Sequence, residues 1–169
     1  LAVAEEIAGR GSAPVFQWIG TADGPERTLV EAAGIPFTAI SAGKFRRYAS
    51  FRNITDVYHV IAGFFQAFAL LGRIRPGVVV AAGGYVAVPV AWAAWLRHIP
   101  VHVHQQDIRP GLANKLIAPL AQSISVAFEP SQADFGAKAA WTGNPVRPML
   151  AKGEKEWVIE AFRIDRSVP

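Results

Sequence analysis

A polar stretch from His104 to Arg109 follows an alternating run of valine and histidine and precedes a proline, a glycine and a helix-like segment. It brings imidazole, amide, carboxylate and guanidinium groups together in a chain that is 51% hydrophobic. Such groups are costly to bury unless a partner satisfies their hydrogen bonds. Asp107 is therefore a candidate general base and Arg109 a candidate phosphate ligand. An ordinary solvated loop is the alternative.

A second candidate is the pair Gly83 and Gly84, which separates a β-branched run from a helix-like run. The phosphates of a ligand could approach the backbone here, at the N-terminus of the next helix. The glycines could equally serve the geometry of the turn alone. Tyr85 follows directly and offers an aromatic face and a hydroxyl to a sugar or peptide, although a tyrosine buried in the core fits the sequence equally well.

Metal chemistry is not indicated. His102 and His104 lie two residues apart on a predicted strand and so share one face, but only Asp107 accompanies them. They are better interpreted as hydrogen-bonding residues at a strand end. The sequence has no Asp-x-Asp pair for a divalent cation and no cysteine, which excludes disulfides and thiolate metal sites. We expect neither a metal nor a cofactor in this part of the protein.

The elements that must position these residues alternate between strand and helix. Strands are predicted at residues 15–20, 37–40, 78–82, 101–104, 123–128 and about 140–142. Helices are predicted from residue 1 to between Gly9 and Gly11, and at 24–34, about 51–73, 86–97 and 111–121. This alternation predicts an α/β fold, with a Rossmann-like parallel sheet and helices on both faces. Ligands of such sheets bind beyond the carboxyl ends of the strands, where residues 20–21, 83–85 and 104–109 fall.

The organisation of the chain suggests a piece of a longer protein. The sequence begins with Leu1 and a helix-like segment, so we expect a first strand to precede it. The stretch GNPVR at 143–147 resembles a domain exit. We therefore assign residues 1–148 to one domain that is incomplete at its start, and residues 149–169 to a linker and the beginning of a second domain.

The long predicted helix carries an apolar and basic signature. Phe64, Phe65 and Phe68 fall within five positions, and basic residues flank them at both ends: Lys44, Arg46, Arg47, Arg52, Arg73 and Arg75. The uncharged run is shorter than the roughly 20 residues that span a bilayer. Apolar anchors ringed by cations are typical of an interfacial contact with anionic lipid, and a helix buried in the core is the alternative. Nucleic acid is not favoured, because the aromatics are phenylalanines of a helix rather than platforms of a strand or groove.

Several segments, in this order and spacing, resemble the N-terminal half of the MurG family. They are LAVAEEIAGRG (1–11), IGTADGPERTLVEAAGIPF (19–37), AGGYV (82–86), HQQD with PGLANK (104–115) and GNPVR (143–147). The resemblance implies an inverting, metal-independent GT-B glycosyltransferase of peptidoglycan synthesis. Such an enzyme transfers N-acetylglucosamine from UDP-N-acetylglucosamine to lipid I and forms lipid II. It works at the cytoplasmic face of the bacterial plasma membrane, as a peripheral protein.

The resemblance also implies roles for residues. Gly83, Gly84 and Tyr85 would shape the acceptor side of the cleft. His104, Gln105 and Asp107 would orient or deprotonate the muramyl hydroxyl, with Asp107 and His104 as the catalytic pair. Arg109 and Asn114 would support the pyrophosphate side or the loop itself. The membrane contact would include Phe64, Phe65, Phe68, Arg73 and Arg75, with Trp95 beside them.

The chain also departs from the family. The glycine-rich loop with its important histidine is expected before Leu1, and most of the UDP-sugar site after Pro169, so we expect this piece alone to be inactive. Where the family usually reads His-Glu-Gln-Asn, this chain reads His104-Gln105-Gln106-Asp107. Two alternatives therefore stay open: a non-catalytic, membrane-associated module of the same fold, and a related GT-B transferase with another acceptor.

Overall fold

The computed structural model describes residues 1–10, 14–43 and 52–147, with the side chains of 52–56 excepted. The chain forms two compact units, one of Leu1–Val15 with Pro145–Pro169 and one of Phe16–Asn144. Residues 149–169, expected to begin a second domain, lie outside the described residues. So do Lys44, Arg46, Arg47 and the side chain of Arg52, which belong to the predicted basic surface.

The smaller unit contains helix α1 (Ala2–Gly9), which ends at Gly9 as the sequence predicts. The carboxylate of Glu5 accepts from the Arg147 guanidinium, with Nη2 and Oε1 2.9 Å apart. This ion pair joins the two ends of the unit across the sequence. Both side chains are about 40% exposed, so solvent screens the pair and its contribution to stability is small.

The larger unit begins with a two-stranded parallel sheet of β1 (Trp18–Gly20) and β2 (Phe37–Ala39). Helix α2 (Arg27–Ala32) connects the two strands. The Gln17 side chain donates to the backbone oxygen of Pro36 at 2.9 Å and to the Thr38 hydroxyl at 3.1 Å. The strands therefore start in a fixed register, with Trp18 opposite Phe37.

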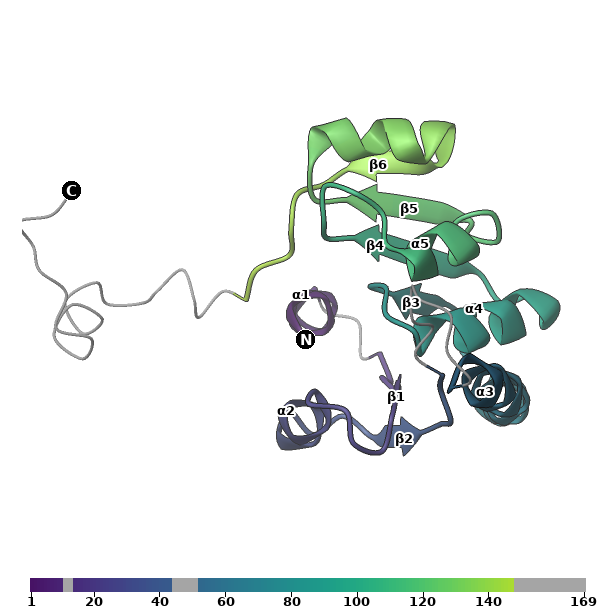
Figure 1. Cartoon of the computed structure of the whole chain (residues 1–169). Helices are drawn as coiled ribbons and strands as arrows, with labels where there is room; N and C mark the ends of the chain where they lie inside the picture. Colours follow the sequence, from purple (N-terminus) through teal and green to yellow (C-terminus); the bar gives the residue numbers. More distant parts are fainter. Residues whose placement is uncertain (11–13, 44–51, 148–169) are drawn as a thin grey trace, which may run out of the picture. The chain divides into compact units, whose positions relative to one another are not determined.

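A four-stranded parallel sheet follows, in the order β3-β4-β5-β6 (Figure 1). Its strands are β3 (Val79–Ala81), β4 (Val101–Gln105), β5 (Ser123–Val126) and β6 (Ala139–Trp141). The connections are α4 (Ala87–Leu96), α5 (Leu112–Ile117) and two short 3₁₀ helices, η1 (Glu129–Asp134) and η2 (Gly136–Lys138). The parallel α/β fold that the sequence predicts is confirmed.

The two faces of this sheet differ in chemistry. Val101 and Val103 of β4 and Ile124 and Val126 of β5 belong to the apolar core, together with buried residues of α4 and α5. The alternation of side chains along a strand turns His102 and His104 to the opposite face, together with Ser123 and Ser125. One face of the sheet therefore carries the core, and the other carries a row of polar side chains.

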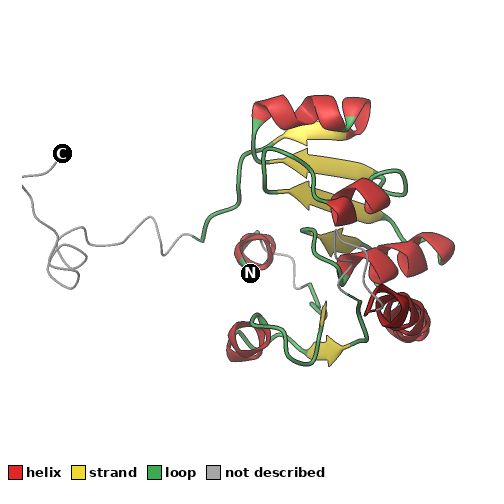
Figure 2. Ribbon diagram, in the orientation of Figure 1, coloured by secondary structure: helices red, strands yellow, loops and turns green. Residues whose placement is uncertain are grey.

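Helix α3 (Arg52–Ile74) packs along α4 and contributes Ala67 and Leu71 to the core. Helices α4 and α5 contact the four-stranded sheet and α3 packs on α4, whereas α2 contacts β2 of the two-stranded sheet (Figures 1 and 2). Two features differ from expectation. The strands form two sheets, since β1 and β3 are not paired in the described residues. The short helices η1 and η2 were not predicted, because 3₁₀ turns carry no 3.6-residue apolar period.

Candidate functional site

The carboxyl end of β3 turns sharply through Gly83 and Gly84, which have φ angles of 93° and 84°. Residues other than glycine rarely adopt φ angles in this range, so the geometry of the turn requires glycine at both positions. A Cβ atom on Gly83 would also lie 3.2 Å from Oδ1 of Asn114. The predicted site residues Gly83 and Asn114 are therefore neighbours, although 31 positions separate them in the sequence.

A pair of buried amides braces the polar loop after β4. Gln105 is 1% exposed, and its Nε2 donates to the backbone oxygens of Asp107 at 2.8 Å and Arg109 at 3.2 Å. Its Oε1 accepts from Nδ2 of Asn114 in α5 at 2.6 Å. Gln105 thus stabilises the turn of the loop, and the hydrogen bond from Asn114 keeps the Gln105 side chain in place.

These contacts fix which way both amides point. The Gln105 amide must aim its N–H groups at the two carbonyls, and so its oxygen faces Asn114. Asn114 must then offer its nitrogen to Gln105, and its Oδ1 faces the Gly83 turn. This buried oxygen has no hydrogen-bond partner among the described residues. Asn114 therefore presents an acceptor to the turn, whereas a phosphate would require a donor.

The charged side chains of the loop point into solvent. Asp107 is exposed, and so is Arg109, whose nearest carboxylate oxygen is that of Asp134 at 3.9 Å. An exposed pair at this separation contributes little to stability, so both charged groups are available to a ligand. Tyr85 is partly buried beside the glycine turn. Buried hydrogen bonds thus hold the backbone of the loop, whereas its charged side chains are accessible to solvent.

On the other face of the sheet, two histidines and two serines form a continuous chain of hydrogen bonds. His102 Nδ1 lies 2.8 Å from Ser123 Oγ, and His102 Nε2 lies 3.0 Å from Ser125 Oγ. The same Ser125 oxygen lies 2.8 Å from Nδ1 of His104. Nε2 of His104 lies 3.4 Å from Oδ1 of Asn144. The interpretation of the two histidines as hydrogen-bonding residues is confirmed.

The pKa of His102 is lowered below its ordinary value of 6.5, first by burial and second by the charge of nearby His104. Burial disfavours the charged imidazolium because it loses water, and two adjacent imidazolium ions would repel each other. Both effects keep His102 neutral near pH 7. A neutral imidazole has one donor and one acceptor nitrogen, as a hydrogen-bond chain requires.

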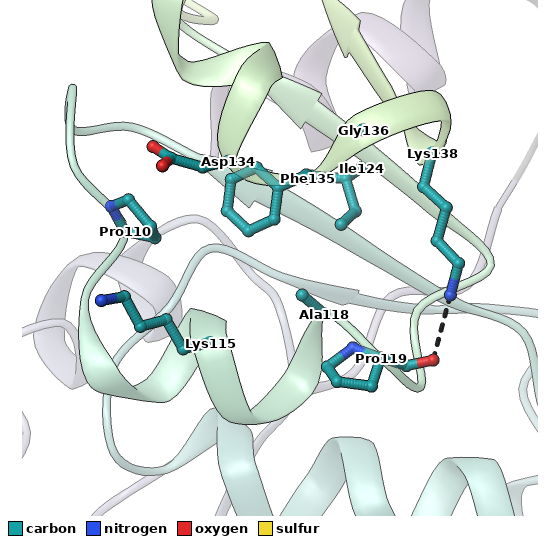
Figure 3. A pocket seen from close by; sticks show the side chains of 9 residues that line it. All are labelled: Pro110, Lys115, Ala118, Pro119, Ile124, Asp134, Phe135, Gly136 and Lys138. Carbon is teal, nitrogen blue, oxygen red and sulfur yellow. Dashed lines mark hydrogen bonds between the residues drawn. The ribbon is translucent and has the colours of Figure 1, made fainter.

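A hollow of about 490 Å³ lies beside this loop, between α5 and the 3₁₀ helices (Figure 3). Lys115 and Asp134 are among the residues that line it, and the Lys138 ammonium donates to the backbone oxygen of Pro119 at 3.0 Å. None of the residues predicted for the site lines this hollow. The polar chemistry therefore lies at the strand ends and not in this depression.

Sequence reasoning missed Ser123, Ser125 and Asn144. Their signal is the alternation in the SISV stretch of β5, which pairs with VHVH of β4 so that His102 faces Ser123 and His104 faces Ser125. Such pairs become visible only once the register of two strands is known. Asn144 was assigned to a domain exit, because nothing in the GNPVR stretch shows that it returns to β4.

The residues predicted for a membrane contact fall into two groups. Phe65 is 64% exposed and Trp95 is 48% exposed, and both arginines of the C-terminal end of α3, Arg73 and Arg75, are also exposed. Phe64 and Phe68 instead pack against the core. The Arg97 guanidinium lies 3.8 Å from the centre of the Phe68 ring and covers it.

Comparison with known proteins gives one consistent result. Residues 1–126 match the glycosyltransferase family 28 N-terminal domain. A protein of Treponema pallidum is 40% identical over the whole chain, and one of Lachnospira eligens is 45% identical over 82% of it. Both are named UDP-N-acetylglucosamine--N-acetylmuramyl-(pentapeptide) pyrophosphoryl-undecaprenol N-acetylglucosamine transferase.

A crystal structure of Acinetobacter baumannii MurG superimposes with a TM-score of 0.68 at 28% identity, over 87% of this chain and 41% of that one. The chain spans 45% of the length of the Treponema relative and 39% of the Lachnospira relative. The match thus covers nearly all of this chain but less than half of each known protein.

Proposed function

The chain belongs to glycosyltransferase family 28, and from this we propose that its complete protein transfers N-acetylglucosamine from UDP-N-acetylglucosamine to lipid I, forming lipid II. The observation that carries the proposal is the 37–45% identity to several proteins that share this transferase name. The family resemblance from sequence is thereby confirmed, and the activity is the one that its relatives are named for.

The described residues suit the acceptor side of such a reaction. The carboxyl ends of β3 and β4 bring the Gly83 turn, the Gln105 brace and the exposed Asp107 to one edge of the sheet. We place His104 and Asp107 at the reacting muramyl hydroxyl, where one accepts the proton and the other orients the oxygen. Asn114 offers an acceptor, so we assign it to the loop and its turn and leave the pyrophosphate to Arg109.

The test is transfer of labelled N-acetylglucosamine by the complete protein to a lipid I analogue, with a chelator present. Product with inverted anomeric configuration is expected, and Asp107→Ala should lower turnover by about 100-fold without loss of folding. Gln106→Ala, an exposed neighbour, is the matched control and should stay near the wild-type rate. A folded protein that binds the donor but forms no product would favour a different acceptor or a non-catalytic module.

We further propose that α3 docks the protein on the cytoplasmic face of the membrane. By length and composition alone, Val57–Ile74 could cross a bilayer, yet Ala67 and Leu71 of this segment are buried in the domain core. The exposed side chains Val57, Ile61 and Phe65 lie four positions apart and share one face of the helix. A peripheral contact through this face uses the exposed stripe and leaves the core intact.

Binding to liposomes tests whether the face of α3 formed by Val57, Ile61 and Phe65 docks on the membrane. Ile61→Asp with Phe65→Asp should reduce binding of the complete protein to vesicles with anionic lipid by at least tenfold, because each carboxylate would have to enter the lipid interface. Leu29→Asp, an equally exposed apolar residue on α2, is the matched control and should bind normally. Equal binding by both variants would contradict the assignment of α3.

A further inference from the structure

The polar face of the sheet contains one unbroken path of hydrogen bonds from an exposed serine to a buried histidine. It runs from Ser123 through His102 and Ser125 to His104, with three links of 2.8 to 3.0 Å. Ser123 is exposed, whereas Ser125 is 8% exposed and His104 is 7% exposed. The path therefore begins in solvent and ends inside the domain, at the sheet edge that carries the proposed site.

Every group in this path both donates and accepts one hydrogen bond. With His104 Nε2–H donating to Asn144 Oδ1, Nδ1 of His104 accepts from the Ser125 hydroxyl. The Ser125 oxygen then accepts from Nε2–H of His102, whose Nδ1 accepts from the Ser123 hydroxyl. All donors and acceptors are matched while both rings stay neutral. In the reversed direction every ring and hydroxyl proton lies on the other atom of its bond, and the Asn144 amide turns so that its Nδ2 donates to His104 Nε2, because an amide oxygen cannot donate.

A path that can be satisfied in two directions can pass a proton from one end to the other. We propose that Ser123, His102, Ser125 and His104 form a proton relay, which carries to solvent the proton that the acceptor hydroxyl loses during glycosyl transfer. The inference rests on the proposed function and adds the exit route of that proton. Ser125 and His102 act through His104, so both are positioning residues and His104 is the group that meets the substrate.

The proton balance of the step is complete. The acceptor oxygen forms its bond to the anomeric carbon as the bond to UDP breaks, and UDP leaves with the bonding electrons. Transfer starts from the reversed direction, in which Nδ1 of His104 carries the ring proton and Nε2 carries none. The hydroxyl proton passes to this Nε2, which gives up its 3.4 Å contact with Asn144. Nδ1–H of His104 passes its proton to Ser125, Ser125 to His102, and His102 to Ser123 and water. Rotation of the two hydroxyls and exchange of the ring protons then restore the starting direction.

The surroundings of the path favour neutral transfer. Within the part of the chain that the structure describes, His104 is the titratable group that acts on His102, and burial also disfavours a positive charge on His102. Among the described residues, no carboxylate is hydrogen-bonded to either ring, so no fixed charge would trap the proton on the way. The hydrogen-bond partners that the geometry gives the two rings are the hydroxyls of Ser123 and Ser125 in β5 and the amide of Asn144.

Chemical rescue of the complete enzyme tests the relay. His102→Ala should lower kcat by about tenfold or more with little change in KM, because proton removal and not binding is impaired. Free imidazole can occupy the half-exposed gap between Ser123 and Ser125 and should restore much of the rate. Ser125→Ala should lower kcat similarly without rescue, and Ser125→Thr, which keeps the hydroxyl, should remain active.

The outcomes separate the relay from the transferase activity. Active wild-type enzyme with unchanged kcat in His102→Ala and Ser125→Ala would overturn the relay and leave the proposed function standing. A lowered kcat that imidazole does not restore in His102→Ala would reduce His102 to a structural role. A folded wild-type protein with no transfer would overturn both. Ring ¹⁵N shifts that show His102 as a neutral imidazole near pH 7 are expected in every case that supports the relay.

Discussion

Gln105 shows how a single amide determines the shape of the candidate site. Its two donated hydrogen bonds, to Asp107 and Arg109, are contacts that a carboxylate cannot make. The family resemblance places a glutamate at this position, so the glutamine of this chain fits a loop that needs a donor. The exchange of a carboxylate and an amide between positions 105 and 107 therefore affects the hydrogen bonds that hold the loop as well as the groups available for catalysis.

Gln105→Glu should consequently destabilise the protein by about 1–3 kcal/mol near pH 7, because the carboxylate would face two carbonyl oxygens in a buried site. Burial and these oxygens raise the pKa of the new carboxyl above its unfolded value of about 4.3. The loss should therefore be smallest below that value, where the protonated carboxyl can donate to one of the two carbonyls, and should grow as pH rises through the folded pKa. Urea unfolding at several pH values measures this, with the exposed Gln106→Glu as the matched control. Equal stability of both variants would show that the loop tolerates a carboxylate.

His102 gives a pH dependence of the opposite sign. Its pKa is lowered by burial and by His104, so below about 6.5 the unfolded chain binds a proton that the folded one does not. The contribution of His102 to stability is thus present above pH 6.5 and is lost as pH falls toward the folded pKa. His102→Gln retains an amide for both serines, and its free energy of unfolding should fall less between pH 7.5 and pH 5. Parallel losses in wild type and variant would contradict the shift.

At the scale of elements, α3 is fixed to the chain after β2 by a close backbone contact. Gly63 is buried against Ser41, whose backbone N–H donates to the Gln66 side chain at 2.7 Å. A Cβ atom on Gly63 would overlap the Ser41 carbonyl oxygen, a backbone atom that cannot rotate away. The position of the helix therefore depends on a residue without a side chain.

Gly63→Ala should destabilise the protein by about 1–3 kcal/mol through overpacking, although alanine favours a helix by about 1 kcal/mol. Gly9→Ala in α1 is the matched control, because no atom lies within 4 Å of its added Cβ. That variant should be as stable as wild type or slightly more stable. Urea unfolding midpoints measure both changes, and similar midpoints would show that α3 shifts freely.

The elements themselves were largely predictable from the sequence. The β-branched runs predicted β3, β4 and β5 within two residues of each end, and the apolar period predicted α3 and α4 within one. What the sequence lacks is the partner of each strand. His104 and Gln105 are adjacent in the sequence, yet they face opposite sides of the sheet and join different networks. The polar cluster that is continuous along the chain therefore divides into two hydrogen-bond networks, and only strand pairing separates them.

At the scale of the whole molecule, the charge distribution matters more than its total. The formal net charge is +4, and six of the 17 basic residues lie between positions 44 and 75 with one acidic residue among them. Of these six, the exposed Arg73 and Arg75 belong to the described residues and close the C-terminal end of α3. A concentrated field next to an apolar stripe orients a protein on an anionic surface, whereas an even distribution of charge would only attract it.

This arrangement predicts both a salt effect and a positional effect on vesicle binding. Arg73→Gln with Arg75→Gln should weaken binding of the complete protein to anionic vesicles by about 25-fold at low salt, since each basic residue near the surface contributes about 1 kcal/mol. The difference from wild type should shrink as salt rises, because exposed charges are screened within about 8 Å at physiological ionic strength. Arg10→Gln with Arg27→Gln removes the same charge from exposed positions directly after α1 and on α2 and is the matched control. If both pairs of substitutions weaken binding equally, net charge alone attracts the protein and α3 does not orient it. If only the α3 pair of substitutions weakens binding, the exposed stripe of Val57, Ile61 and Phe65 and the arginines that follow it form one docking surface.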